Sequence, residues 1–104
     1  MKRLPKYNSY RRFLKRKYPE LSIQRRKTPN DCWGWYEDFK IVVSNEIPDQ
    51  MFAMSILTHE LAHYLAADKE KEAHDRWFGA GYYKAYQVYL EWLEWNTSEN
   101  GDNA

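Results

Sequence analysis

Apolar residues occur on every side of the segment Gln50–Ala66 when it is drawn as a helix. The residues that define this pattern are Met51, Phe52, Met54, Ile56, Leu57, Leu61, Ala62, Leu65 and Ala66. Asp49, directly after Pro48, is the expected N-cap. A helix that is apolar all round is typically buried, so we expect this one at the centre of the domain.

A first helix is expected over residues 8–18, with Asn8 or Ser9 as N-cap and Pro19 just past its end. Its apolar stripe at helical spacing consists of Tyr10, Phe13, Leu14 and Tyr18. Four basic residues lie off that stripe, namely Arg11, Arg12, Lys15 and Arg16. The pattern therefore predicts an amphipathic helix with a basic outer face.

Three short strands are expected between the two helices. Residues 21–26 form the first, and residues 32–36 and 39–44 form a hairpin that turns at Glu37-Asp38. The run Ile41-Val42-Val43 is the strongest strand signal in the chain. We expect these strands to form a small antiparallel sheet packed on the central helix.

A long second helix is expected over residues 70–95. Residues 96–104 are polar without periodicity, which predicts a disordered tail. The order of elements predicts an α+β fold, with residues 1–95 as a single domain.

Length and composition restrict the class of protein and its expected cellular location. At 104 residues the chain is long enough for one modest core. Its single cysteine, Cys32, excludes an internal disulfide. Because the chain shows neither an apolar run of membrane-spanning length nor a signal peptide, we expect a soluble cytoplasmic protein without a membrane partner.

The net charge of +1 hides a strong asymmetry. Residues 1–27 hold eleven of the sixteen Lys and Arg and one acid, a net +10, whereas the remainder holds five basic and fourteen acidic residues, a net −9. Such an N-terminal arm can contact DNA, through Arg11, Arg12, Lys15 and Arg16 and with Tyr7, Tyr10 and Tyr18 stacking on bases. A solvated helix face, or an arm folded onto the acidic remainder, explains the same charge.

All three histidines lie within residues 58–78, and they carry the candidate chemistry. His59 and His63 are four residues apart, so on a helix their side chains stack one turn above the other. Two imidazoles so placed can bind one Zn²⁺, and Glu60 beside them can act as a general base. The sequence therefore predicts a zinc site on the central helix.

A catalytic zinc usually has three protein ligands. Lys69 stands where the metzincin pattern requires a histidine, which leaves His74 or Glu72 as the main candidates, ahead of Asp68 and Asp75. Residues two apart on a helix point about 200° from each other, so only one of the two can face the central helix. The face of Glu72 carries Arg76, Gly79, Tyr83, Tyr86 and Leu90, whereas the face of His74 carries Phe78, Gly81, Tyr82, Ala85, Val88, Tyr89 and Trp92. The second face is more apolar, which favours His74 as the third ligand.

Several of these segments together resemble the SprT-like zinc peptidases, the group that includes the DNA-dependent protease Spartan. The segments are Gly34-Trp35-Tyr36, Lys40–Ser44, Leu57–His63 and the pair His74 and Phe78. The resemblance implies a minimal zincin-like core, DNA-associated protein substrates, and pairing of an extended substrate with the free edge of the strand Lys40–Ser44. The chain departs from the pattern at Asp75, where glycine often follows the third histidine, and in the spacing from His63 to His74.

A rival resemblance is to the ImmA/IrrE-type peptidases. Glu70-Lys71-Glu72-Ala73 is similar to their Glu-bearing second motif. That resemblance implies Glu72 as the third ligand.

We therefore expect a small zinc-dependent metalloendopeptidase that acts on a protein or peptide substrate. His59, His63 and His74 hold one zinc per chain, Glu60 is the catalytic base, and Tyr64 or Tyr82 is the candidate oxyanion stabiliser. The alternative is a metal-stabilised module that binds protein or nucleic acid without turnover. Glu60 argues against it, because a structural zinc does not require that carboxylate.

Overall fold

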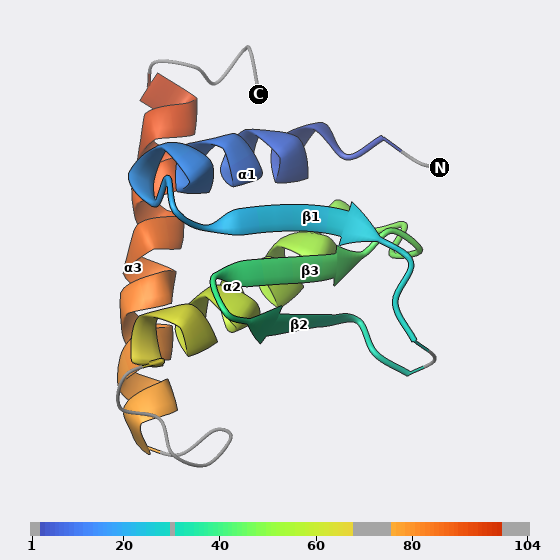
Figure 1. Cartoon of the computed structure of the whole chain (residues 1–104). Helices are drawn as coiled ribbons and strands as arrows, with labels where there is room; N and C mark the ends of the chain where they lie inside the picture. Colours follow the sequence, from blue (N-terminus) through green and yellow to red (C-terminus); the bar gives the residue numbers. More distant parts are fainter. Residues whose placement is uncertain (1–2, 30, 68–75, 99–104) are drawn as a thin grey trace.

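Three helices and a three-stranded sheet form the part of the chain that the computed structural model describes, residues 3–29, 31–67 and 76–98 (Figure 1). The elements are α1 (Pro5–Lys17), β1 (Ser22–Arg26), β2 (Gly34–Glu37), β3 (Lys40–Ser44), α2 (Gln50–Ala66) and α3 (Arg76–Ser98). The predicted α+β class is confirmed. Within these residues, no helix combines the length and the apolar character needed to cross a membrane.

The sheet is mixed, with strand order β1-β3-β2. β2 runs antiparallel to β3, as expected for a hairpin, but β1 pairs with β3 in parallel, with Ile23 opposite Ile41. The expectation of a purely antiparallel sheet is therefore wrong for β1. The long connection after β1 carries the chain past β3 before the hairpin begins, so β1 and β3 run in the same direction.

Strand β3 lies at the centre of the sheet, and Ile41, Val42, Val43 and Ser44 are all buried. Its backbone pairs with β1 on one side and with β2 on the other. The expectation of a free edge along Lys40–Ser44 is therefore wrong. Among the described strands, β1 and β2 form the two edges of this sheet.

The hairpin turns at Asp38-Phe39, one residue later than expected. Both residues have positive φ, 50° and 65°, and Glu37 pairs with Lys40 across the turn. Two such residues form the type I′ turn whose twist matches that of the flanking strands. Phenylalanine rarely adopts this conformation, which explains why the sequence pattern pointed elsewhere.

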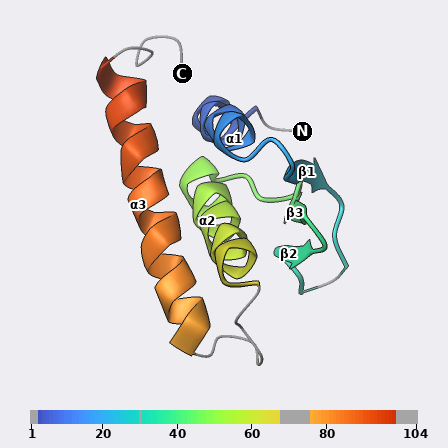
Figure 2. The same ribbon diagram turned by 60° about the vertical axis from the view of Figure 1, so that its left-hand side comes forward.

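Helix α2 has the predicted bounds and lies between the sheet and α3 (Figure 2). The Asp49 carboxylate accepts a hydrogen bond from the Phe52 amide at 2.9 Å, which confirms the predicted N-cap. Gly81 lets α3 approach α2 closely, because a Cβ at this position would lie only 2.5 Å from the Ala62 carbonyl oxygen. The central helix is thus covered on both sides.

Helix α1 begins at Pro5, three residues before the expected start. Proline is favoured at the first helical position, so Asn8 and Ser9 lie inside the helix and neither caps it. Fully buried side chains on or beside α1 join it to the main core; these are Leu4, Tyr7, Tyr10 and Leu14. The basic segment is therefore an integral part of the fold and not an arm.

Helix α3 continues to Ser98, beyond the expected end at Trp95. Asn96 is buried, and its side-chain oxygen accepts a hydrogen bond from the Ser9 hydroxyl at 3.0 Å. The Trp92 indole donates to the same hydroxyl at 3.1 Å. Residues 96–98 are therefore helical and not part of a disordered tail, and residues 99–104 lie outside the described residues.

Candidate metal centre

His59 and His63 lie one turn apart on α2, and their ring centroids are 5.2 Å apart. Both side chains are half-buried. A tetrahedral zinc with Zn–N distances of about 2.0–2.1 Å holds the centres of two bound imidazoles roughly 5 Å apart. The separation of the two rings therefore fits a shared zinc ion.

Phe78 of α3 packs against both histidines. Its ring centroid lies 4.5 Å from that of His63 and 5.1 Å from that of His59. Such contacts limit the rotation of both imidazoles, because neighbouring rings in van der Waals contact restrict the accessible rotamers. The first turn of α3 thus orients the histidine pair.

Glu60 points to a different side of α2, toward strand β2. Only 7% of its surface is exposed. Opposite it stands Gly34, where a Cβ would lie 3.7 Å from the Glu60 Cγ and as close as 2.7 Å to the Val42 carbonyl oxygen. The glycine is required by the close packing of β2 on β3 and α2, since the same Cβ would also lie 2.8 Å from the Ile56 Cγ2, whereas its contact with Glu60 would be an ordinary one.

The predicted third ligand, His74, and its alternative, Glu72, lie outside the described residues, as do Asp68 and Asp75. Residues 3–29, 31–67 and 76–98 by themselves contain no group of three or more His, Cys, Asp or Glu side chains close enough to hold a metal. The described part of the site thus supplies two imidazoles and a neighbouring carboxylate.

The burial of α3 bears on the choice between the two ligands. On the helix face predicted for His74, four residues are buried, two are half-buried and one is exposed: Gly81, Ala85, Val88 and Trp92, then Phe78 and Tyr89, and lastly Tyr82. On the face predicted for Glu72, all five described residues are exposed, namely Arg76, Gly79, Tyr83, Tyr86 and Leu90. The prediction of the inward face of α3 is confirmed, and the assignment of His74 as ligand stays a prediction.

The two candidate tyrosines occupy different surroundings. The Tyr64 hydroxyl donates a hydrogen bond to the Glu20 carboxylate. Burial and Glu20 raise the pKa of Tyr64, and the same hydrogen bond lowers the pKa of Glu20. The Tyr82 ring lies 6.5 Å from that of His59 and 5.9 Å from that of Phe78. This arrangement favours Tyr82 over Tyr64 as the candidate for contact with a substrate.

Comparisons with known proteins gave no significant match to a family model, to a curated protein or to a solved structure. The resemblance to SprT-like peptidases therefore rests on the residues themselves.

The four basic residues predicted to contact DNA divide into two pairs. The Arg11 guanidinium donates to the Ile23 carbonyl at 2.7 Å, and the Lys15 ammonium donates to the Leu21 carbonyl. Arg12 and Arg16 are exposed. Arg11 and Lys15 thus hold α1 against the β1 segment. Of the second pair, Arg16 lies over the Trp95 ring, with its Cζ 5.9 Å from the ring centroid.

Two of the three tyrosines expected to stack on bases are buried. Tyr7 and Tyr10 are completely buried, and the half-buried Tyr18 packs edge-on against Tyr64 with ring centroids 5.5 Å apart. The predicted stacking role is wrong for Tyr7 and Tyr10, because their spacing matches the buried stripe of α1 and not its outer face.

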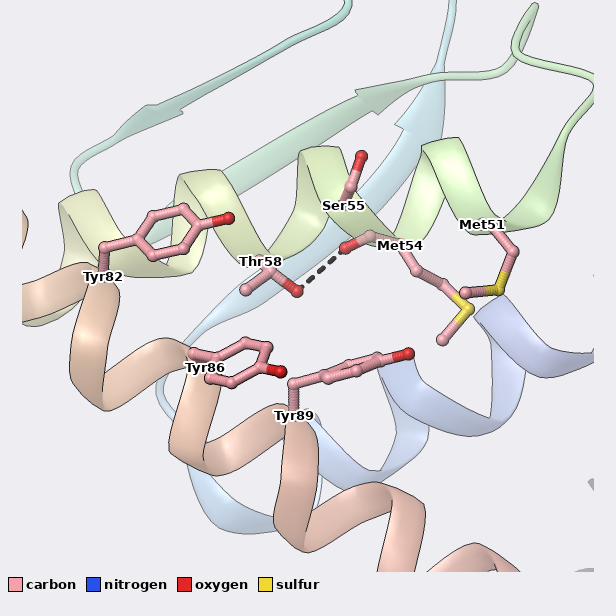
Figure 3. Close-up of a pocket in the computed structure, with 7 residues that line it drawn as sticks. All are labelled: Met51, Met54, Ser55, Thr58, Tyr82, Tyr86 and Tyr89. Atoms are coloured by element: carbon pink, nitrogen blue, oxygen red, sulfur yellow. Dashed lines mark hydrogen bonds between the residues drawn. The ribbon is translucent and has the colours of Figure 1, made fainter.

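A pocket of about 180 Å³ lies in the groove between α2 and α3 (Figure 3). Two methionines and two hydroxyl residues line it from α2, and three tyrosines line it from α3: Met51, Met54, Ser55, Thr58, Tyr82, Tyr86 and Tyr89. Sequence reasoning missed this pocket. The apolar positions of each helix were visible, but the gap between two helices is set by side chains distant in the sequence.

Proposed function

We propose that this chain is a small zinc-dependent metallopeptidase. The observation that carries the proposal is the 5.2 Å separation of the His59 and His63 rings on a buried helix, with Glu60 next to them in the chain. Neutral imidazoles at this separation can hold one zinc ion, and a further ligand from residues 68–75 would complete the set. When bound, zinc supplies a Lewis acid that lowers the pKa of a water molecule to about 7.

Each described residue has a defined part in this proposal. His59 and His63 hold the metal, and Phe78 fixes the orientation of both rings. The Glu60 carboxylate takes a proton from the attacking water and passes it to the leaving amine. Tyr82, beside His59, is the nearest candidate to donate a hydrogen bond to the developing oxyanion.

The edge of β2 is the best-placed surface for the substrate backbone. β2 is an edge strand, and its first residue, Gly34, lies against the Glu60 side chain. An extended peptide that adds to a free strand edge gains main-chain hydrogen bonds. A peptide paired with β2 would therefore pass close to the proposed base.

Zinc analysis combined with one isosteric substitution tests this proposal. Glu60→Gln keeps the size of the side chain but removes the base, so zinc content should stay near one per chain while cleavage of an unfolded protein substrate collapses. Chelation should abolish the activity of the wild type and lower its melting temperature. The proposed peptidase mechanism would be refuted by a chain that binds no zinc or by a Glu60→Gln variant that cleaves like the wild type.

A second candidate function, contact with DNA, is favoured by the exposed cations of α1 and β1. Arg12 and Arg16 project from α1, and Arg26 and Lys27 are exposed at the end of the neighbouring strand. Phosphate contacts through such residues give an affinity that falls steeply with salt. Arg12→Gln with Arg16→Gln should flatten that dependence and cost at most about 0.5–1 kcal/mol of stability from the lost contact between Arg16 and the Trp95 ring. Arg11→Gln removes the hydrogen bond to the Ile23 carbonyl and should lower the melting temperature more. Equal DNA binding by the double variant and the wild type would exclude Arg12 and Arg16 as DNA contacts.

A further inference from the structure

We propose that the pocket between α2 and α3 receives one uncharged, apolar side chain of the peptide substrate and so selects the residue beside the cleaved bond. This inference rests on the proposed function and names the substrate class of the same site. Four properties of the pocket support it: its position, its chemistry, its size and its shape.

Two lining residues of the pocket, Tyr82 and Thr58, are neighbours of His59. The Tyr82 ring lines the pocket and stands edge-on to the His59 ring, with the two ring centroids 6.5 Å apart. On α2, Thr58 directly precedes His59, and Ser55 lies one turn before it. A peptide whose backbone crosses the histidines can therefore place one side chain into this groove.

The described lining of the pocket carries no charged residue. Both hydroxyl protons from α2 are already donated to protein carbonyls, that of Ser55 to Phe52 at 2.7 Å and that of Thr58 to Met54 at 2.9 Å. The remaining walls are thioethers and the rings of three tyrosines, which favour contact with apolar groups, and the phenol hydroxyls are the only further polar side-chain groups of the described lining. An ionised side chain would lose its hydration here without gaining a charged partner.

The volume restricts what can enter. Pockets that hold whole drug-sized ligands measure about 300–1,000 Å³. This pocket, at about 180 Å³, is smaller and suits a single side chain. The two methionines can adjust to aliphatic or aromatic shapes, because their thioether chains are flexible.

The pocket has a buried floor and an open rim. Met54 and Thr58 are 2% and 5% exposed, whereas Tyr82, Tyr86 and Met51 are 39%, 48% and 53% exposed. Figure 3 shows the tyrosine rings projecting from α3 across the groove, with both methionines at the end away from Tyr82. A side chain can therefore enter from solvent and bury its apolar surface against Met54.

Binding can be tested without relying on catalysis. In wild-type protein labelled at the methionine methyl groups, N-acetyl-phenylalanine amide and N-acetyl-leucine amide should shift the NMR signals of Met51 and Met54. The amides of N-acetyl-aspartate and N-acetyl-lysine should not. Ser55→Phe fills the groove and should weaken binding about tenfold or more. Tyr83→Ala, on the solvent-facing side of α3 and outside the pocket lining, should bind like the wild type.

Cleavage of a peptide library gives the second readout. Wild-type protein should prefer large apolar residues at one position beside the cleaved bond, and Tyr86→Ala, which widens the rim, should relax that preference toward tryptophan. Three results would overturn the proposed role of the pocket: equal binding of charged and apolar amides, methyl signals that no amide shifts, or cleavage without side-chain preference. Absence of zinc binding and of cleavage, with the methyl shifts intact, would instead overturn the peptidase and with it the pocket's role in substrate selection.

Discussion

The Tyr10 hydroxyl lies 2.7 Å from the Thr58 Oγ1, which joins α1 to the helix that carries His59 and His63. The Thr58 hydroxyl donates its one proton to the Met54 carbonyl, so Tyr10 is the donor of this bond. Both side chains are buried, and burial raises the pKa of Tyr10. The residue directly before the first histidine is thus fixed by the N-terminal helix.

Removing either partner of this bond should have unequal effects. Thr58→Val leaves the Tyr10 hydroxyl buried without its acceptor and should lower the free energy of unfolding by about 1–3 kcal/mol. Tyr10→Phe leaves Thr58 bonded to Met54 and should cost about 0.5–1.5 kcal/mol. Urea unfolding of the two single variants and the double variant measures the coupling. Purely additive effects would contradict a direct bond.

The glycines of α3 provide a matched pair of substitutions. Gly81→Ala places a Cβ 2.5 Å from the Ala62 carbonyl oxygen, so it should push α3 away from α2 and destabilise the fold by about 1–3 kcal/mol. Gly79→Ala meets nothing within 4 Å among the described residues and should stabilise the helix by about 0.5–1 kcal/mol. Thermal melts of both variants check the signs, and a harmless Gly81→Ala would argue against the close approach of the helices.

Alkaline pH should reveal the buried phenol of Tyr7. Burial raises the pKa of Tyr7 to about 12, although Arg25 and Arg11 oppose the shift. An unfolded tyrosine titrates near pH 10. The raised pKa of Tyr7 therefore contributes to the free energy of unfolding in full below pH 10, and this contribution is lost as the pH rises toward 12. Two pKa units correspond to about 2–3 kcal/mol.

Tyr7→Phe should reduce the fall in the free energy of unfolding at alkaline pH, as measured by urea unfolding at pH 7 and pH 11. Among the described residues, the Tyr7 hydroxyl has no hydrogen-bond partner, so the variant should be at least as stable as the wild type at pH 7. Tyr83→Phe, at a largely exposed tyrosine, serves as the control. Identical alkaline profiles for wild type and Tyr7→Phe would contradict the assignment.

The third ligand can be assigned by a pair of alanine substitutions. The sequence predicts His74 on the helical face whose described residues in α3 are mostly buried, so His74→Ala should reduce zinc affinity at least about tenfold. Glu72→Ala should leave zinc affinity nearly unchanged. Titration with a fluorescent zinc chelator measures both. The reverse order would favour a carboxylate ligand and the ImmA/IrrE-type arrangement.

Local patterns predicted the elements that carry strong local signals. The helix Gln50–Ala66 and its Asp49 cap were predictable because its apolar residues and capping residue lie within one segment. The hairpin was predictable within a residue or two at each strand end for the same reason. The inward face of α3 followed from periodicity alone.

The features that were missed depend on contacts between distant segments. The parallel pairing of β1 with β3 depends on where the intervening chain runs, which no local pattern records. The charge of residues 1–27 suggested a solvated arm, yet Tyr7 and Tyr10 alternate with the basic residues and are buried. Pro5 was a usable signal for the start of α1, because proline is favoured at that position.

The bond between Ser9 and Asn96 joins residues 87 positions apart in the chain. Contacts between such distant residues form only after most of the polypeptide is available, and they slow folding. During synthesis, α1 must therefore wait for α3 before Ser9 can meet Trp92 and Asn96. The order of translation thus delays these contacts until α3 has left the ribosome. Until then, a nascent chain carries α2, with His59 and His63, without the packing that α3 provides.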